Sequence, residues 1–215
     1  MKRPTNSDAR RPLCASEIFP DPQRIPARAY DSAGWDRFLK THPATPALVY
    51  APLGCWWLWQ SYRAPGFVGS TWVLYVSGLF LWTLLEYGIH RGLLHFADVN
   101  ALWNMDLARI HARHHEHPED VSQVIISPVQ TLPLAGVLYL ILRVFLNAPR
   151  AGGVLAGITT GYLCYESFHY AFHAPESLSW KWLNALRKYH ARHHFETPDG
   201  RFGVTSPLWD LAFGA

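Results

Sequence analysis

The sequence has few cysteines, few charges and no leader-like segment. Cysteine occurs only at Cys14, Cys55 and Cys164, with no CxxC pair, which argues against a disulfide framework and against a thiolate zinc site. Charged residues make up 16% of the chain and the formal net charge is +3, too weak a bias to indicate nucleic acid as a partner. The first 46 residues contain no long apolar core, so no signal peptide is predicted.

Long apolar stretches are what the sequence has instead, and they cover residues 47–62, 67–86, 128–146 and 154–172. A membrane-spanning helix needs about 20 apolar residues, and all but the first stretch come near that length. The first is short and contains Pro52, so it could be a re-entrant or tilted segment. We predict an all-α integral membrane protein with about four transmembrane helices. The alternative, a soluble all-helical protein with very apolar core helices, is disfavoured because residues 67–85 show no polar face.

The distribution of basic residues predicts how the chain is oriented. An even number of spans places residues 1–46, 87–127 and 174–215 on one side, and these segments hold most of the Lys and Arg. The positive-inside rule then puts them in the cytoplasm, where they would form a cap on the membrane helices. We divide the chain into a flexible N-terminal arm, 1–46, with a possible surface helix over 35–40, and a membrane domain, 47–215.

Histidine is the residue type that points to chemistry, because ten of the 12 histidines fall into four clusters. The clusters read HxxxxH, HxxHH, HxxxH and HxxHH, and their members are His90, His95, His111, His114, His115, His169, His173, His190, His193 and His194. Residues three and four apart share a helix face, so we expect the three imidazoles of each HxxHH to project toward one point. His90 and His95 are five apart, about 140° around an ideal helix, so they can converge only if the helix ends or loosens. Gly88 and Gly92 would permit this.

Ten clustered imidazoles indicate a metal centre, since each would otherwise carry unmet hydrogen-bonding groups in a partly dry site. Ten ligands suffice for two ions with about five each. Imidazole suits iron, zinc, copper and nickel, so the ligands alone leave the metal open. A site at a membrane surface beside apolar spans favours two iron ions and oxygen chemistry on lipid, with zinc as a possible substitute in purified material. His42 and His117 lie outside the clusters and are interpreted as non-ligands.

The order of the clusters and the sequence around them resemble the fatty acid hydroxylase superfamily, and within it the fatty acid 2-hydroxylases. The resemblance covers about residues 67–215 and is carried by EYGIHRGLLH, HEHPEDVSQVIISPV, GYLCYESFHYAFH, YHARHHF and FGVTSPLWDLAFG. It implies a di-iron monooxygenase that uses O2 to hydroxylate carbon 2 of a fatty acyl chain, free or in a sphingolipid or other membrane lipid. It also implies that all ten clustered histidines are ligands.

This chain departs from the family pattern in two ways. It has Glu166 where relatives often have aspartate, and it shows no fused haem domain of the cytochrome b5 type, because the His42-Pro43 pair is not followed by glycines. Electrons would therefore come from a separate donor, cytochrome b5-like or ferredoxin-like. The missing haem domain and the short length favour a bacterial inner membrane over the endoplasmic reticulum.

Three carboxylates are candidates for orienting the histidine rings. Glu86 precedes His90 by four residues and Glu166 precedes His169 by three, so each could accept a ring N–H. The alternative for both is a charge that anchors a helix end at the interface. Asp210 could pair with a histidine or an arginine, or cap a helix.

Two other functions remain open at this point. One is a different oxidation within the superfamily: sterol or carotenoid hydroxylation, sphingoid-base hydroxylation, or desaturation. The other is a membrane metal transporter, which would place ionisable ligands near the middle of broken helices, whereas these histidines lie at the ends of the apolar stretches.

Overall fold

The protein is described here by a computed structural model that covers residues 41–66, 68–95, 107–174 and 180–215. Within these ranges every regular element is a helix, which agrees with the all-α prediction. The predicted flexible arm lies mostly outside the described residues, and the predicted surface helix over 35–40 lies wholly outside them.

Four long helices form the body of the molecule, and each corresponds to one apolar stretch of the sequence. They are α3 (Thr45–Arg63), α4 (Val68–Gly88), α7 (Pro128–Phe145) and α8 (Ala148–His173). Helix α8 begins six residues before the apolar stretch, because Asn147 caps it: its side-chain oxygen accepts a hydrogen bond from the Arg150 N–H at 3.1 Å. Pro149 in the first turn needs no N–H partner, which also favours a helix start there.

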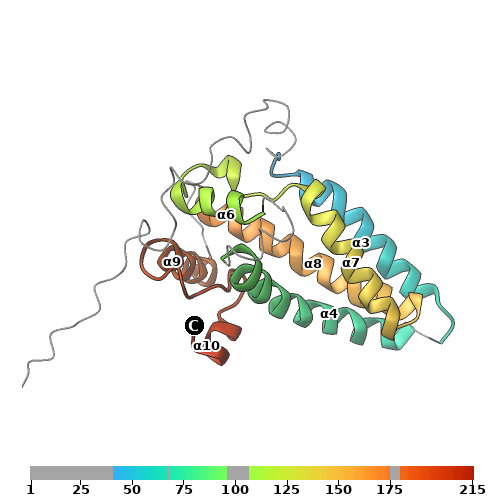
Figure 1. The fold of residues 1–215 in the computed structure, drawn as a ribbon. Helices are drawn as coiled ribbons and strands as arrows, with labels where there is room; N and C mark the ends of the chain where they lie inside the picture. Colours follow the sequence, from blue (N-terminus) through green and yellow to red (C-terminus); the bar gives the residue numbers. More distant parts are fainter. Residues whose placement is uncertain (1–40, 67, 96–106, 175–179) are drawn as a thin grey trace, which may run out of the picture.

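The shorter elements gather at one end of these four helices, on the left of Figure 1. They form a cap that consists of the π-helix η2 (Ile89–Leu94), α6 (Leu107–Glu116), the 3-10 turn η3 (Val121–Gln123), α9 (Lys181–Phe195) and α10 (Leu208–Phe213). The connections from α3 to α4 and from α7 to α8 lie together at the opposite end. The chain therefore enters the cap twice from long helices, once after α4 and once after α8.

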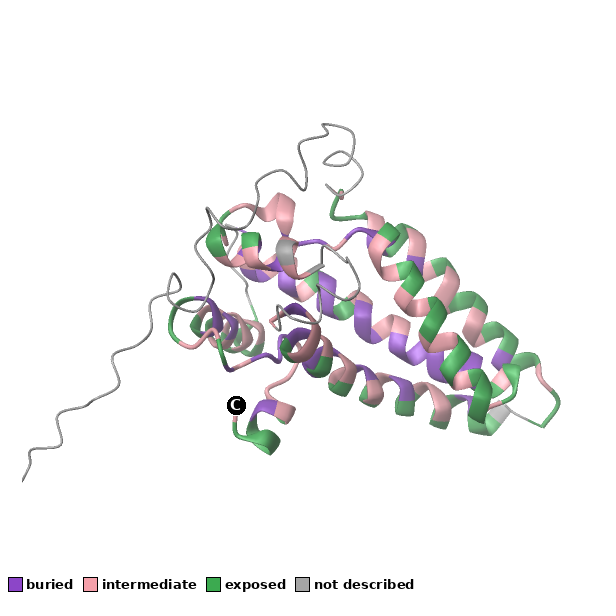
Figure 2. Ribbon diagram, viewed as in Figure 1, coloured by how far each residue is buried: buried purple, intermediate pink, exposed green. Residues whose placement is uncertain are grey.

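Helix α8 is the centre of the bundle, and buried positions recur along its whole length, drawn in purple in Figure 2. It packs closely on α4 because glycines face each other where the two helices cross. A Cβ atom at Gly157 would lie 2.0 Å from the backbone oxygen of Tyr75, and one at Gly78 would lie 2.1 Å from that of Val154. Small residues at such crossings let two backbones touch, as in membrane helix pairs.

The outer faces of α4 and α7 expose large apolar side chains. These include Trp72, Val73, Val76, Phe80, Val137, Leu140, Ile141, Val144 and Phe145. Two stretches, Gly69–Leu94 and Val121–Phe145, are long and apolar enough to cross a membrane by length and composition. An apolar surface of this extent is unusual on a soluble monomer and fits a protein of the membrane type.

Candidate metal centre

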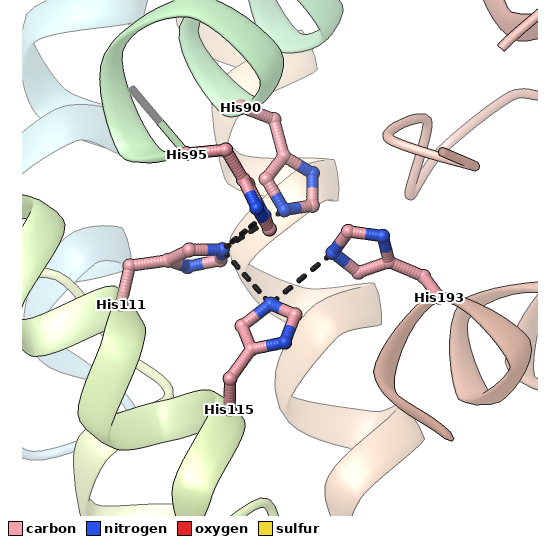
Figure 3. Close-up of side chains that lie close together, drawn as sticks. All are labelled: His90, His95, His111, His115 and His193. Atoms are coloured by element: carbon pink, nitrogen blue, oxygen red, sulfur yellow. Dashed lines mark hydrogen bonds between the residues drawn. The ribbon is translucent and has the colours of Figure 1, made fainter. Parts of the chain in front are cut away.

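All ten clustered histidines converge where the long helices enter the cap, and they sort into two groups of five. The first group is His90, His95, His111, His115 and His193, and the second is His114, His169, His173, His190 and His194. In each group the ligand nitrogens all lie within 4.8 Å of one another. Figure 3 shows the first group, with rings from η2, from His95 directly after it, and from α6 and α9 pointing at a common centre. His42 and His117 lie outside both groups.

The prediction that the three imidazoles of each HxxHH motif project toward one point is wrong. His111 and His115 of α6 belong to the first group, but His114 between them belongs to the second. Helix α9 does the reverse, since His190 and His194 join the second group and His193 joins the first. The reason is angular: residues i and i+4 are about 40° apart on a helix, whereas i+3 and i+4 are about 100° apart. The two groups thus share both motifs and lie side by side, with the His115 and His194 rings stacked 4.2 Å apart.

The HxxxxH cluster converges because the helix loosens, as its spacing predicted. Residues Ile89–Leu94 form a π-helix, whose i to i+5 hydrogen bonds bring side chains five apart to one face. His90 and His95 consequently both lie in the first group, each with Nε2 3.0 Å from Nε2 of His111. Short π-helical segments inside α-helices are frequent at functional sites.

The spacing of the nitrogens suits metal coordination better than hydrogen bonding. His111 Nε2 lies 3.0 to 3.1 Å from the Nε2 atoms of His90, His95 and His115, yet one ring nitrogen carries only one hydrogen or one lone pair. Two nitrogens about 2.1 Å from one ion are about 3.0 Å apart at a right angle and about 3.4 Å apart at the tetrahedral angle. The 3.0 Å between Nε2 of His190 and those of His173 and His194 fits the same right-angled arrangement.

Burial keeps these imidazoles neutral, which is the form that binds a metal. Seven of the ten are buried and the other three are half-buried. Burial lowers the pKa of His95 to about 3 and that of His193 to about 4. Neither ring nitrogen of His114 or His169 has a hydrogen-bond partner among the described residues. Uncharged, unsatisfied imidazoles in a dry site would be costly in the absence of an ion.

Backbone carbonyls fix the orientation of three of the rings. The Nδ1–H groups of His90 and His193 donate to the carbonyl oxygens of Phe202 at 2.5 Å and Gly200 at 2.6 Å. His173 donates in the same way to the carbonyl of Pro118 at 2.9 Å. A hydrogen bond from Nδ1–H sets the tautomer and leaves Nε2 free for an ion. These carbonyls were not anticipated from the sequence.

None of the three candidate carboxylates hydrogen-bonds a histidine ring among the described residues. Glu86 and Asp210 are buried, and their hydrogen bonds go to backbone amides of residues 202–205 and not to histidine rings. Glu166 is also buried, one turn before His169, and neither of its carboxylate oxygens has a hydrogen-bond partner among the described residues. Spacing along a helix therefore did not give the hydrogen-bond partners of Glu86 and Glu166.

The fold and the site together define a class: a helical, membrane-type protein with a histidine-rich centre that could hold metal ions. The chain belongs to the fatty acid hydroxylase family, whose model matches residues 75–215. The match begins within α4 and includes all ten histidines of the two groups.

Named relatives agree with this family. The chain is 31% identical over 189 residues to dihydroceramide fatty acyl 2-hydroxylase FAH2 of Arabidopsis thaliana, covering 87% of this chain and 78% of that protein. It is 34% identical over 142 residues to fatty acid 2-hydroxylase of Macaca fascicularis, covering 65% of this chain but only 38% of that protein. The solved structure of full-length Scs7p, of which only the hydroxylase domain is visible, has a TM-score of 0.76 and 29% identity, covering 86% and 70% of the two chains.

Proposed function

We propose that the protein is a fatty acyl 2-hydroxylase that holds two iron ions at the ten histidines and uses O2 and electrons from a separate donor. The observation that carries the proposal is the sorting of ten buried or half-buried imidazoles into two groups of five within a fatty acid hydroxylase domain. Relatives named as fatty acid and dihydroceramide fatty acyl 2-hydroxylases support an acyl chain as the substrate. A cytochrome b5-like or ferredoxin-like protein would supply the electrons.

The residues present fit such ions. Each group offers five neutral nitrogens, and their near 3.0 Å spacing suits five or six ligands at right angles better than a tetrahedral zinc site. When bound, the two ions would supply the O2 activation that cleavage of an unreactive C–H bond requires. The protein's own part is to hold the rings in place through the carbonyls of Pro118, Gly200 and Phe202. Burial of the histidine rings excludes water from the centre, which protects a reactive site from side reactions.

We further propose that all four long helices cross the membrane and that the cap faces the cytoplasm. Exposed tryptophans support two interfacial belts, with Trp59 and Trp72 toward the end away from the cap and Trp180 and Trp182 in the cap. The basic residues of the cap segments support the orientation, because the opposite end of the long helices carries only Arg63, Arg143 and Arg150. The bacterial inner membrane stays a prediction from the sequence, and the relatives named above are a plant and an animal protein.

The other functions weighed from the sequence fit less well. A transporter would carry its ligands near the middle of broken helices, whereas these histidines lie at the cap ends of α4 and α8 and on α6 and α9. Oxidation of a sterol, carotenoid or sphingoid base would use a similar centre, but the named relatives are acyl 2-hydroxylases.

Lipid mass spectrometry tests the reaction directly. In a host that lacks 2-hydroxylated lipids and supplies a suitable electron donor, wild type should produce acyl chains one oxygen heavier, with fragments that place the hydroxyl at carbon 2. His193→Ala, which removes a ligand nitrogen from the first group, should produce none. His42→Ala removes an exposed histidine and should match wild type. A hydroxyl at another carbon, or a product that persists in His193→Ala, would contradict the proposal.

Metal exchange tests the identity of the ions. Stripping the purified protein with a chelator should abolish hydroxylation, and Fe²⁺ should restore it. Zn²⁺ should refill the imidazole sites without restoring activity, because zinc has no redox chemistry. Metal content, measured by mass spectrometry, and turnover would be determined on the same samples. Together they would show whether the zinc-loaded protein has both metal sites occupied but no hydroxylation activity. Activity with Zn²⁺ alone would count against iron.

A further inference from the structure

Residues 200–205, here called the clasp loop, lie within the connection between α9 and α10 and approach the first histidine group. Two of the loop's carbonyl oxygens accept hydrogen bonds from ligand rings, Phe202 from His90 at 2.5 Å and Gly200 from His193 at 2.6 Å. The loop is buried at Phe202 and Val204. The position of this loop therefore sets the orientation of two of the five rings in the first group.

Two carboxylates from distant parts of the chain hold the clasp loop by its backbone. Asp210 of α10 accepts from the amides of Phe202 at 2.7 Å and Gly203 at 2.9 Å. Glu86 of α4 accepts from the next two amides, Val204 at 2.6 Å and Thr205 at 2.8 Å. The Thr205 hydroxyl also donates to Glu86, at 2.5 Å. Four consecutive amides are thus bound, two by each carboxylate.

The loop is built around these contacts. Asp210 is 1% exposed and Glu86 is 3% exposed, so neither carboxylate has water as an alternative partner. A Cβ atom at Gly203 would lie 2.0 Å from the Ser206 carbonyl oxygen and 2.9 Å from Asp210 Oδ2, so only glycine fits there. Hydrogen bonds from amides to a buried carboxylate are among the stronger kinds in proteins.

The clasp loop serves one histidine group only. His90 and His193 both belong to the first group. In the second group, the ring-to-carbonyl contact found within the described part of the chain is that of His173, and it uses Pro118 in a different loop. Disturbing the clasp loop should therefore affect the two groups unequally.

We infer that Asp210 and Glu86 are positioning residues for the ion of the first group, acting through the clasp loop without touching a ligand. This inference rests on the proposed metal centre. Loss of a group that orients a ligand ring typically weakens metal binding by about 10- to 100-fold. Asp210→Asn replaces one acceptor oxygen by an NH2 group that faces a backbone N–H. It should let the loop shift and weaken the first ion while leaving the second unchanged.

Zn²⁺ binding in purified protein measures this without relying on activity. Wild type, Asp210→Asn and Glu196→Gln would be loaded with Zn²⁺ and titrated with a competing chelator. In Asp210→Asn one of the two ions should bind about 10- to 100-fold more weakly, and the other as in wild type. Glu196→Gln makes the same change in charge at an exposed position and should behave as wild type.

Combined variants identify which ion is affected. With His114→Ala, the first group is the intact one, and adding Asp210→Asn should weaken its ion. With His193→Ala, the second group is intact, and adding Asp210→Asn should leave its ion unchanged.

If Asp210→Asn does not fold, Thr205→Val removes only the hydroxyl bond to Glu86 and should cause a smaller loss at the same ion. Equal weakening of both ions, or no weakening in either variant, overturns the inference. A wild type that binds no ion would instead overturn the proposed function.

Discussion

Replacing His114 by alanine is expected to abolish acyl 2-hydroxylation and to empty one metal site while the other remains filled. His114 lies between His111 and His115 on α6, but its nitrogens belong to the second group with His169 and His190. Its removal should lower turnover by more than about 100-fold, since losing a ligand costs at least as much as losing a group that orients one. The five nitrogens of the first group stay in place, so the ion content should fall from about two to about one per chain.

Metal analysis and lipid analysis of the same preparation check this result. His117→Ala is the matched control, because His117 directly follows the same helix, is exposed, and its ring contacts Glu119 at 3.4 Å among the side-chain contacts described. It should keep both ions and full turnover. Loss of both ions in His114→Ala, with the protein still folded, would mean that the two groups do not bind independently. Unchanged turnover would remove His114 from the centre.

The spacing of the histidines predicted the centre well but not its internal division. The i, i+3, i+4 pattern of His111, His114 and His115 correctly indicates one side of a helix. Whether that side faces one ion or two depends on where α9 lies opposite α6, and α9 is separated from α6 by the whole α7–α8 hairpin. A contact of such long sequence separation is a property of the packed fold, which local periodicity does not contain.

The groups that orient the rings were harder to predict for a different reason. Spacing suggested that Glu86 would contact His90, yet its carboxylate binds the amides of Val204 and Thr205, and His90 uses the Phe202 carbonyl. Every residue has a backbone carbonyl and amide, so no residue type marks the ones that are used. In the sequence, the carboxylates Glu86 and Asp210 were the only visible sign of these orienting contacts. They lie close to the contacts, but their sequence positions did not show that backbone amides are what they bind.

The apolar stretches predicted the four long helices because length and hydrophobicity are local properties. They did not predict that α8 lies at the centre of the bundle. Its glycines were the sign, because Gly153, Gly157 and Gly161 recur every four residues and so lie on one side of the helix. Close approach of another backbone is the usual reason for such a pattern in an apolar helix.

Replacing Gly157 by leucine is accordingly expected to disrupt the packing of α8 on α4. Its Cβ atom would lie 2.0 Å from the Tyr75 carbonyl oxygen and 2.9 Å from the Gly78 Cα, and both are backbone atoms that cannot move without shifting a helix. Overpacking of this kind should cost more than about 3 kcal/mol in the free energy of unfolding. Because α4 continues into η2 with His90, and α8 carries His169 and His173 at its cap end, separation of the two helices should also disturb both histidine groups.

Thermal unfolding in detergent, together with ion content, measures the two consequences of Gly157→Leu. Gly136→Leu on α7 is the matched control, since a Cβ atom there meets nothing within 4 Å and the position is exposed. It adds the same side chain to a long helix and should leave both stability and ion content near wild type. If Gly157→Leu unfolded like Gly136→Leu, the close backbone contact between α4 and α8 would be wrong. If it lost stability but kept both ions, the cap would hold the two groups without the helix crossing, and the centre would depend on α6, α9 and the clasp loop alone.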